Sequence, residues 1–259
     1  MKSATHYLAD AAPGWFTIDT LDKDALIGRA RIPKTPWTAK GLHLRAFGDR
    51  TPKVREETPG VDLPARCPER HIQGDQTFCL GLSYIDVRSM NDAARWWEQL
   101  RQYLVCQGVA ERTRIWPPSH ALDHGDAGRH HERALALAAE AELEEEYAAA
   151  RMDEPSWLTD ERLHLFGKKG HPINGRALCP RGCLRRARGR QARVLRKDCS
   201  KRSLFVDLAY TEHLRRKALA DYWNHVFNEG TRCCRSMRSC PLGAHEDQLR
   251  ANSAEGGQS

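Results

Sequence analysis

The sequence predicts an α+β fold in which an antiparallel sheet packs against a helix. Residues 15–19, 26–32 and 42–47 are short segments rich in strand-forming and alternating apolar residues, and the loops between them are short. Short loops favour an antiparallel meander, because parallel strands need a longer crossover. Residues 90–107 then repeat apolar side chains with the 3.6-residue period of a helix that buries one face.

The remaining elements of this first region have weaker sequence signals. Residues 53–57 predict a fourth strand, which is short and exposed, and residues 1–13 are barely long enough for a helix before the sheet. For the helix over 90–107 we expect Asn91 or Asp92 as the N-cap and Gly108 as the stop, with its Trp and Leu side chains facing the sheet.

A second helical region follows a Trp-Pro-Pro break at residues 116–118. Residues 126–152 are rich in alanine and glutamate, which have strong helix propensity. Because no motif such as His-Glu-x-x-His is present there, we interpret the nearby histidines as exposed or packing side chains. These are His120, His124, His130 and His131.

Composition places the chain among globular proteins. It has 259 residues, 40% hydrophobic residues and a net charge of +7. No apolar run approaches the roughly 18 residues that a membrane span requires, and the first residues lack the hydrophobic region of a signal peptide. We therefore expect a cytoplasmic protein with no membrane partner.

The nine cysteines predict metal or catalytic thiols, because a chain without an export signal has little use for a disulfide framework. Four thiolates bind a structural zinc ion in a tetrahedral set. Cys179 and Cys183 form the first candidate pair, Cys199 a third ligand, and one of three later cysteines the fourth. Six of the nine cysteines lie in the final third and are the candidate ligands: Cys179, Cys183, Cys199, Cys233, Cys234 and Cys240.

A dense run of arginine and lysine over residues 181–202 surrounds these cysteines. Such a run can bind nucleic acid, bind an acidic protein or form a solvated face. Aromatic residues for base stacking are nearly absent from it, so nucleic acid is a less favoured partner.

The segment 67–82 carries the most informative pattern. An isoleucine, a Gly/Asp turn and then Thr-Phe-Cys-Leu place Cys79 on an extended segment just after a tight loop. Most free cysteines are small core residues, and we expect Cys106 on the long helix to be one.

This segment resembles the active-site region of ubiquitin-conjugating (E2) enzymes, whose pattern reads His-Pro-Asn-Ile, a polar turn, then the catalytic cysteine and leucine. Arg70 and His71 stand where the family has Pro and Asn, and Cys79 stands at the nucleophile. The spacing also agrees, since His71 precedes Cys79 by 79 − 71 = 8 positions. The resemblance extends to the order of strands, catalytic loop and following helix, and so implies the E2 fold.

The resemblance implies a bacterial carrier that accepts a ubiquitin-like protein on Cys79 from an E1-like enzyme and transfers it to a target. Some bacterial pathways of this kind act in defence against phage. His71 would support the oxyanion or the loop. Cys67 is the rival nucleophile. Two other functions stay open: a non-catalytic E2 variant that only binds the modifier, and a zinc-containing nucleic-acid-binding protein.

These patterns divide the chain into four expected parts. Residues 14–115 form the conjugating-enzyme-like domain and residues 116–165 a helical connector. Residues 166–245 form the cysteine-rich basic module, and residues 246–259 a disordered tail.

Overall fold

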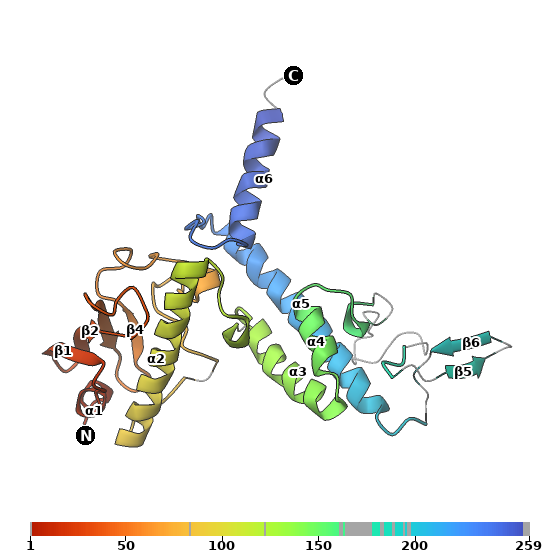
Figure 1. The fold of residues 1–259 in the computed structure, drawn as a ribbon, viewed down its shortest axis with the longest axis horizontal. Helices are drawn as coiled ribbons and strands as arrows, with labels where there is room; N and C mark the ends of the chain where they lie inside the picture. Colours follow the sequence, from red (N-terminus) through yellow and green to blue (C-terminus); the bar gives the residue numbers. More distant parts are fainter. Residues whose placement is uncertain are drawn as a thin grey trace. The chain divides into compact units, whose positions relative to one another are not determined.

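The computed structural model describes residues 2–82, 84–121, 123–160, 163, 178–181, 184–187, 190–193, 195 and 198–255. The chain forms two compact units. The first consists of residues 1–122 together with 226–259, and the second of residues 123–225. Figure 1 labels the elements of both units.

The first unit contains a four-stranded antiparallel sheet. Its strands are β1 (Phe16–Leu21), β2 (Ala25–Ala30), β3 (Leu42–Phe47) and β4 (Lys53–Glu56). They lie side by side in chain order, each hydrogen-bonded to the next. The predicted antiparallel meander is therefore confirmed, including the short fourth strand, although β4 is not exposed as predicted because Val54 and Glu56 are buried.

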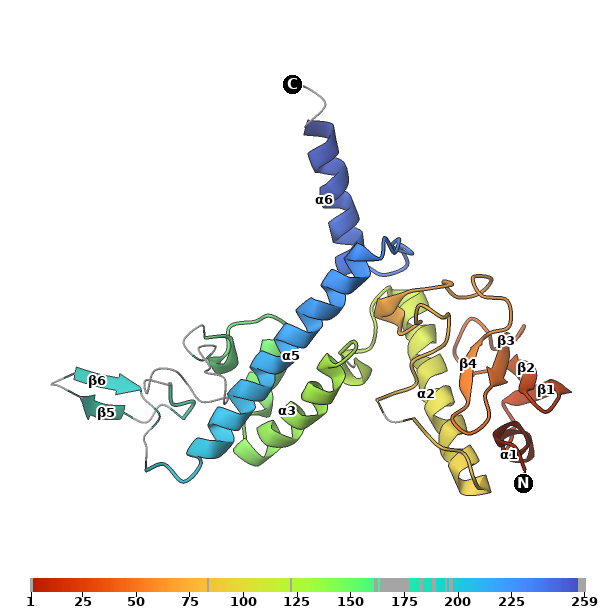
Figure 2. The same cartoon turned by 180° about the vertical axis from the view of Figure 1, so that it is seen from behind.

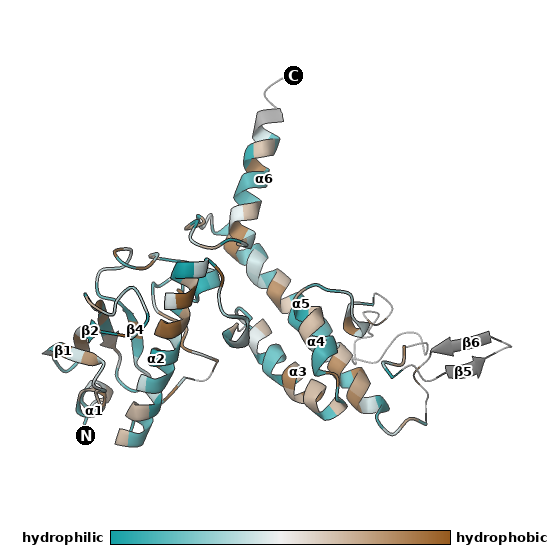
Figure 3. Ribbon diagram, in the orientation of Figure 1, coloured by the Kyte–Doolittle hydropathy of each residue, from teal (hydrophilic) through white to brown (hydrophobic). Residues whose placement is uncertain are grey.

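Two helices pack with this sheet. The short α1 (Ala4–Asp10) uses the brief N-terminal segment, and the long α2 (Met90–Thr113) lies beside the sheet in both views (Figures 1 and 2). The indole N–H of Trp97 donates to the carbonyl of Leu8 in α1 at 2.9 Å, and that of Trp96 donates to the loop before β4 at 3.0 Å. Hydrophobic and hydrophilic residues alternate along α2 in Figure 3, as expected of a helix with one buried face.

The ends of α2 differ from those predicted. Ser89 caps the helix by accepting a hydrogen bond from the N–H of Asp92. Gly108 does not stop the helix, which continues to Thr113. A Cβ at Gly108 would lie 2.6 Å from Cγ2 of Thr35, so the glycine allows a close approach of the loop before β3.

The second unit is mainly helical. It contains α3 (Ala127–Ala141), α4 (Glu144–Arg151) and most of α5 (Arg202–Asn228). The single helix predicted over 126–152 is interrupted at Glu142, which adopts the left-handed conformation with φ of 57°. After this break, Leu143 is buried in a core that α3, α4 and α5 share.

The described residues of the second unit also include three shorter elements. They are the 3₁₀ turn η3 (Trp157–Thr159) and the antiparallel pair β5 (Leu184–Ala187) and β6 (Arg190–Arg193). The paired strands fall within the basic run over residues 181–202.

The core of the second unit also buries charge. Arg215 donates to both carboxylate oxygens of Glu212, at 2.6 and 2.8 Å, and to Asp123 at 2.9 Å. Nearby, Nδ1 of His131 lies 2.7 Å from the hydroxyl of Tyr147. Burial opposes the charge of Arg215, but the hydrogen bonds and negative charge of Glu212 raise its pKa.

The C-terminal segment returns to the first unit. There α6 spans Pro241–Glu255, so most of the tail predicted to be disordered is helical. The short turns η1 (Pro68–Arg70) and η2 (Pro118–His120) flank the region described next. No helix in the described part of the chain is long and apolar enough to cross a bilayer.

Candidate functional site

Residues 67–79 fold into two consecutive tight turns. Cys67 and Ile72 exchange main-chain hydrogen bonds of 3.2 and 3.0 Å, and Ile72 forms a second antiparallel bridge with Phe78. The N–H of Phe78 donates to the carbonyl of Val54 at 2.8 Å, which ties the loop to β4. The sheet therefore fixes the loop that ends at Cys79.

His71 occupies a special backbone position between the two turns. It ends η1 in the left-handed conformation, with φ of 54°. Asn, Asp and His are enriched among the non-glycine residues that adopt this conformation. The carbonyl of His71 accepts a hydrogen bond from the N–H of Cys79 at 2.8 Å, and its ring lies 4.8 Å from that of Trp116. His71 and Cys79 are thus held as direct neighbours across the loop.

The thiol of Cys79 is half-buried and lines a cavity of about 260 Å³. His71, Trp116 and His120 line the same cavity. Cys79 also borders a second hollow of about 30 Å³, which Tyr84 helps to line. The structure therefore brings the two residues predicted as catalytic, Cys79 and His71, to one accessible space.

Helix α2 supports the loop through neutral hydrogen-bond donors. The hydroxyl of Tyr103 donates to the carbonyls of Arg70 and His71 at 3.0 and 3.4 Å, and the side-chain amide of Gln107 donates to the carbonyl of Arg70 at 2.7 Å. The ring of Tyr103 stacks on Phe78 at 4.8 Å. Burial raises the pKa of Tyr103 well above its usual value, so the hydroxyl stays a donor.

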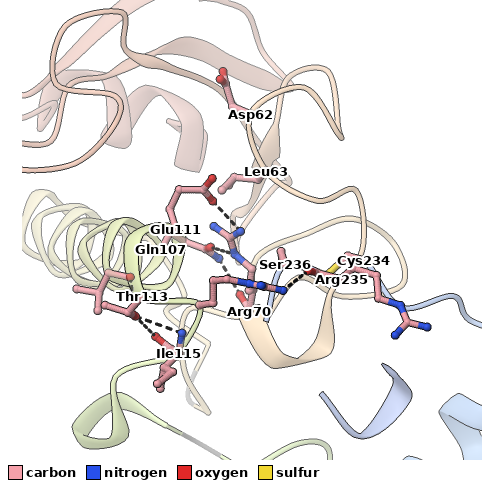
Figure 4. Close-up of polar contacts among 12 residues, drawn as sticks. Asp62, Leu63, Arg70, Gln107, Glu111, Thr113, Ile115, Cys234, Arg235 and Ser236 are labelled. Carbon is pink, nitrogen blue, oxygen red and sulfur yellow. Dashed lines mark hydrogen bonds and ion pairs between the residues drawn. The ribbon is translucent and has the colours of Figure 1, made fainter. Parts of the chain in front are cut away.

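Arg70, a residue of the loop, also anchors the loop by extending its side chain to α2. Its side chain is only 1% exposed, and its Nε donates to Gln107 at 2.8 Å. One terminal nitrogen reaches Glu111 at 2.9 Å, as Figure 4 shows. The other terminal nitrogen is buried and has no hydrogen-bond partner among the described residues.

The two other thiols between β1 and η2 are buried. Cys106 lines the same cavity as Cys79, and burial raises its pKa to about 11, as expected of a core cysteine. Cys67 is 1% exposed. A hydrogen bond with Cys234 and burial raise the pKa of Cys67, so it is a poorer nucleophile than an accessible thiol would be.

The six candidate zinc ligands are distributed over both units. Cys179 and Cys199 lie in the second unit, and Cys233, Cys234 and Cys240 lie in the first. Cys183 lies outside the described residues. In the part of the chain that the structure describes, no three His, Cys, Asp or Glu side chains are arranged as a ready metal site.

Several residues at the cavity were not predicted from the sequence to belong to the site. His120 was expected to be exposed or to pack; it is exposed, and it also lines the cavity with Cys79. Tyr103 and Gln107 fall within the helix predicted over 90–107 without a role at the site, whereas in the structure they hold the loop. Their spacing of four on the predicted helix shows that they share a face, but it does not show which loop they meet.

Comparison with known families agrees with this architecture. Residues 15–118 match the family model described as a prokaryotic E2 domain. Residues 123–242 match a cysteine-rich domain that lies C-terminal to E2 domains. Neither the curated proteins nor the solved structures gave a match. The chain belongs to the prokaryotic E2-like proteins in which a cysteine-rich domain follows the E2 domain.

Proposed function

We propose that this protein is a conjugating enzyme that carries a ubiquitin-like protein as a thioester on Cys79. The observation that carries the proposal is the position of this thiol. Cys79 is half-buried beside a cavity of about 260 Å³, at the end of a loop fixed by β4 and α2. The match to a prokaryotic E2 domain over residues 15–118 supports the same reaction class.

The chemistry consists of two acyl transfers. The Cys79 thiolate attacks the carbonyl of the modifier's C-terminal thioester on an E1-like enzyme, and the E1 thiolate leaves. An amine of the target then attacks the thioester on Cys79, loses a proton, and the Cys79 thiolate leaves. Each step passes through an oxyanion that a nearby donor stabilises.

His71 is the proposed support for that oxyanion or for the loop around it. It lines the cavity with Cys79, and its carbonyl accepts the hydrogen bond from the N–H of Cys79. An imidazole N–H can donate a hydrogen bond as the side-chain amide of asparagine does. The same position can thus serve the same role with a different residue.

The proposed partners follow from the reaction. They are an E1-like activating enzyme, a ubiquitin-like modifier and a target protein in a bacterial conjugation pathway, with phage defence as its proposed purpose. We place the reaction in the cytoplasm, because activation of the modifier consumes ATP.

The decisive experiment combines the full-length protein with the E1-like enzyme and ubiquitin-like protein of the same genome, and ATP. We expect an adduct that a reducing agent cleaves. Cys79→Ser should replace it with an oxyester that resists the reducing agent, because a serine oxygen forms an ester. Cys106→Ser is the matched control, since Cys106 lines the same cavity but is buried; this variant should charge normally.

Two outcomes would contradict the proposal. An adduct that persists in Cys79→Ala protein would assign the reaction to another thiol. Modifier that binds without any covalent adduct, while the E1-like enzyme itself is charged, would make the domain a non-catalytic binding module.

A further inference from the structure

Four cysteines of the first unit form a cluster separate from Cys79. Cys67 begins the turn that leads to His71, whereas Cys233, Cys234 and Cys240 belong to the segment that connects α5 and α6. The sulfur of Cys67 is hydrogen-bonded to that of Cys234, and the sulfur of Cys240 to that of Cys233. Because Cys233 and Cys234 are adjacent, the two pairs are neighbours. We refer to these four residues as the thiol cluster.

Main-chain N–H groups point at every sulfur atom of the thiol cluster. The N–H of Arg235 donates to Sγ of Cys233 at 3.4 Å, and the N–H of Ser236 donates to Cys234. Likewise the N–H of Arg70 donates to Cys67, and those at the start of α6 donate to Cys240. Every sulfur of the cluster therefore accepts a main-chain hydrogen bond from two or three residues further on. Such bonds stabilise a thiolate and orient it as a metal ligand.

A buried cation lies beside the thiol cluster. The positive charge of Arg70 acts on Cys234, and one terminal nitrogen of Arg70 is buried without a hydrogen-bond partner in the described structure. Figure 4 shows Arg70 near the segment that carries Cys234 and Ser236. A zinc ion with four thiolates keeps a net negative charge. Arg70 provides a compensating charge and a free donor at this place.

The segment that carries three of the cysteines is already attached to the E2 domain. The N–H of Arg238 donates to the carbonyl of Arg114 at 2.9 Å, and the side chain of Arg114 donates to the carbonyl of Arg235 at 2.8 Å. An ion pair of 2.6 Å joins Arg66 to Glu229. These contacts hold both sides of the cluster together without the sulfur atoms.

We propose that the thiol cluster binds a structural zinc ion, with Cys67 of the E2 domain as a ligand together with Cys233, Cys234 and Cys240. The site would use three of the ligands predicted from the sequence and add one that was interpreted as a rival nucleophile. Zinc must draw the two hydrogen-bonded pairs together, because no three of these side chains are yet arranged around one point. Binding replaces the thiol protons, which are released, with zinc–sulfur bonds of about 2.3 Å.

The consequence of this site is a link between the two matched domains. Residues 226–242 belong to the cysteine-rich domain by their family match but to the same compact unit as the E2 domain. Zinc would fasten this segment to Cys67, which is directly hydrogen-bonded within the loop that leads to Cys79. The metal supports the shape of the loop and does not take part in the acyl transfer.

The first test measures zinc in the reduced, full-length protein by elemental analysis. We expect about one zinc ion per chain at this site. Cys67→Ser and Cys234→Ser should each lower the zinc bound there at least about tenfold, because three ligands hold a structural ion poorly. Cys106→Ser and Cys79→Ser should keep it, since neither thiol belongs to the cluster. Cobalt substitution should give the intense visible absorption of a tetrahedral thiolate site in the same proteins.

A second test needs no variant and therefore does not depend on whether Cys67→Ser folds. In the wild-type protein, an alkylating reagent should modify Cys79 whether or not zinc is present. It should modify Cys67, Cys234 and Cys240 only after a chelator removes the metal. Mass spectrometry of the peptides gives the extent of modification at each residue.

Three results would overturn the site. The first is full zinc content and full cobalt absorption in Cys67→Ser protein. The second is zinc that only Cys179→Ser or Cys199→Ser removes. The third is purified protein without zinc in which mass spectrometry finds Cys67 joined to Cys234 by a disulfide. None of these measurements uses charging of Cys79, so they are independent of the proposed enzymatic function.

Discussion

Buried polar side chains have different roles in the two compact units. In the first unit, Tyr103 and Gln107 are buried as neutral donors that hold the main chain of the loop before Cys79. In the second unit, Glu212, Arg215 and Asp123 bury opposite charges that bind one another. The first arrangement positions the group that we propose to react, and the second joins helices. Damage to the first should therefore appear in the rate of reaction, and damage to the second in stability alone.

Of the variants considered, Glu212→Gln should produce the largest difference in stability between the two units. Glu212 is fully buried, and its loss would leave Arg215 with a buried charge that only Asp123 offsets. Breaking a buried pair in this way costs about 3–5 kcal/mol. Amide hydrogen exchange should show the loss in α3 and α5 and leave β2 and β3 protected. Glu144→Gln, at an exposed position of α4, should change exchange by less than about 0.5 kcal/mol. If Glu212→Gln slowed the charging of Cys79 and left amide hydrogen exchange unchanged, the proposed difference between the two units would be wrong.

The corresponding change in the first unit is His71→Ala. If His71 supports the oxyanion or its loop, discharge of a preformed thioester should slow by about 100- to 1000-fold. His71→Asn should recover much of the rate, because asparagine also donates a hydrogen bond and tolerates the left-handed conformation. His43→Ala on β3 is the control and should discharge normally. Equal rates for His71→Ala and the wild type would remove His71 from the mechanism.

The first unit was more predictable from sequence than the second. The period-2 strands, their short loops and the Trp and Leu repeat of α2 are local patterns, and they gave the order and type of the elements. The C-terminal end predicted for α2 was wrong because Gly108 serves a tertiary contact with Thr35. A local pattern carries no information about such a contact.

The cysteines show that sequence spacing also predicts only part of the candidate site. Spacing singled out Cys79 and His71, and the structure places both at one cavity. Spacing could not pair Cys67 with Cys234, because 234 − 67 = 167 positions separate them and only the returning C-terminal segment brings them together. It likewise could not divide the later cysteines between the two units. The fold determines those groupings.

A pH titration tests the second unit without removing an ion pair. Burial, followed by the charge of Arg151, lowers the pKa of His131 to about 4. The histidine is then neutral in the folded state, while its unfolded pKa is about 6.5. Stability is therefore complete above pH 6.5 and falls as the pH decreases toward 4, by about 3 kcal/mol for such a shift. Hydrogen exchange of α3 at a series of pH values measures this loss.

Replacement of the titrating group should remove that dependence. His131→Gln keeps a hydrogen-bonding partner for Tyr147 but does not titrate, so the stability of α3 should vary less between pH 6.5 and 4. His225→Gln, at an exposed position of the same unit, is the control and should keep the wild-type slope. The same slope in all three proteins would show that other groups cause the pH dependence.

The smallest predicted effect is that of Tyr103→Phe, which removes one donor and keeps the ring that stacks on Phe78. The carbonyl of Arg70 keeps its bond from Gln107, so the cost to stability should be about 1 kcal/mol. Discharge should slow by about fivefold, because about 1 kcal/mol lost from the support of His71 corresponds to that change in rate. A structural role alone would lower stability and leave the rate unchanged.

A double-variant cycle decides between these two roles for Tyr103. If its hydroxyl acts through His71, Tyr103→Phe should slow discharge in the wild-type background but add little to His71→Ala, while the stability loss should be the same in both. Tyr147→Phe is the matched control in the second unit, where the hydroxyl contacts His131. It should reduce protection of α3 and leave the discharge rate unchanged. Additive rates for Tyr103→Phe and His71→Ala would mean that α2 acts on Cys79 by a route other than His71.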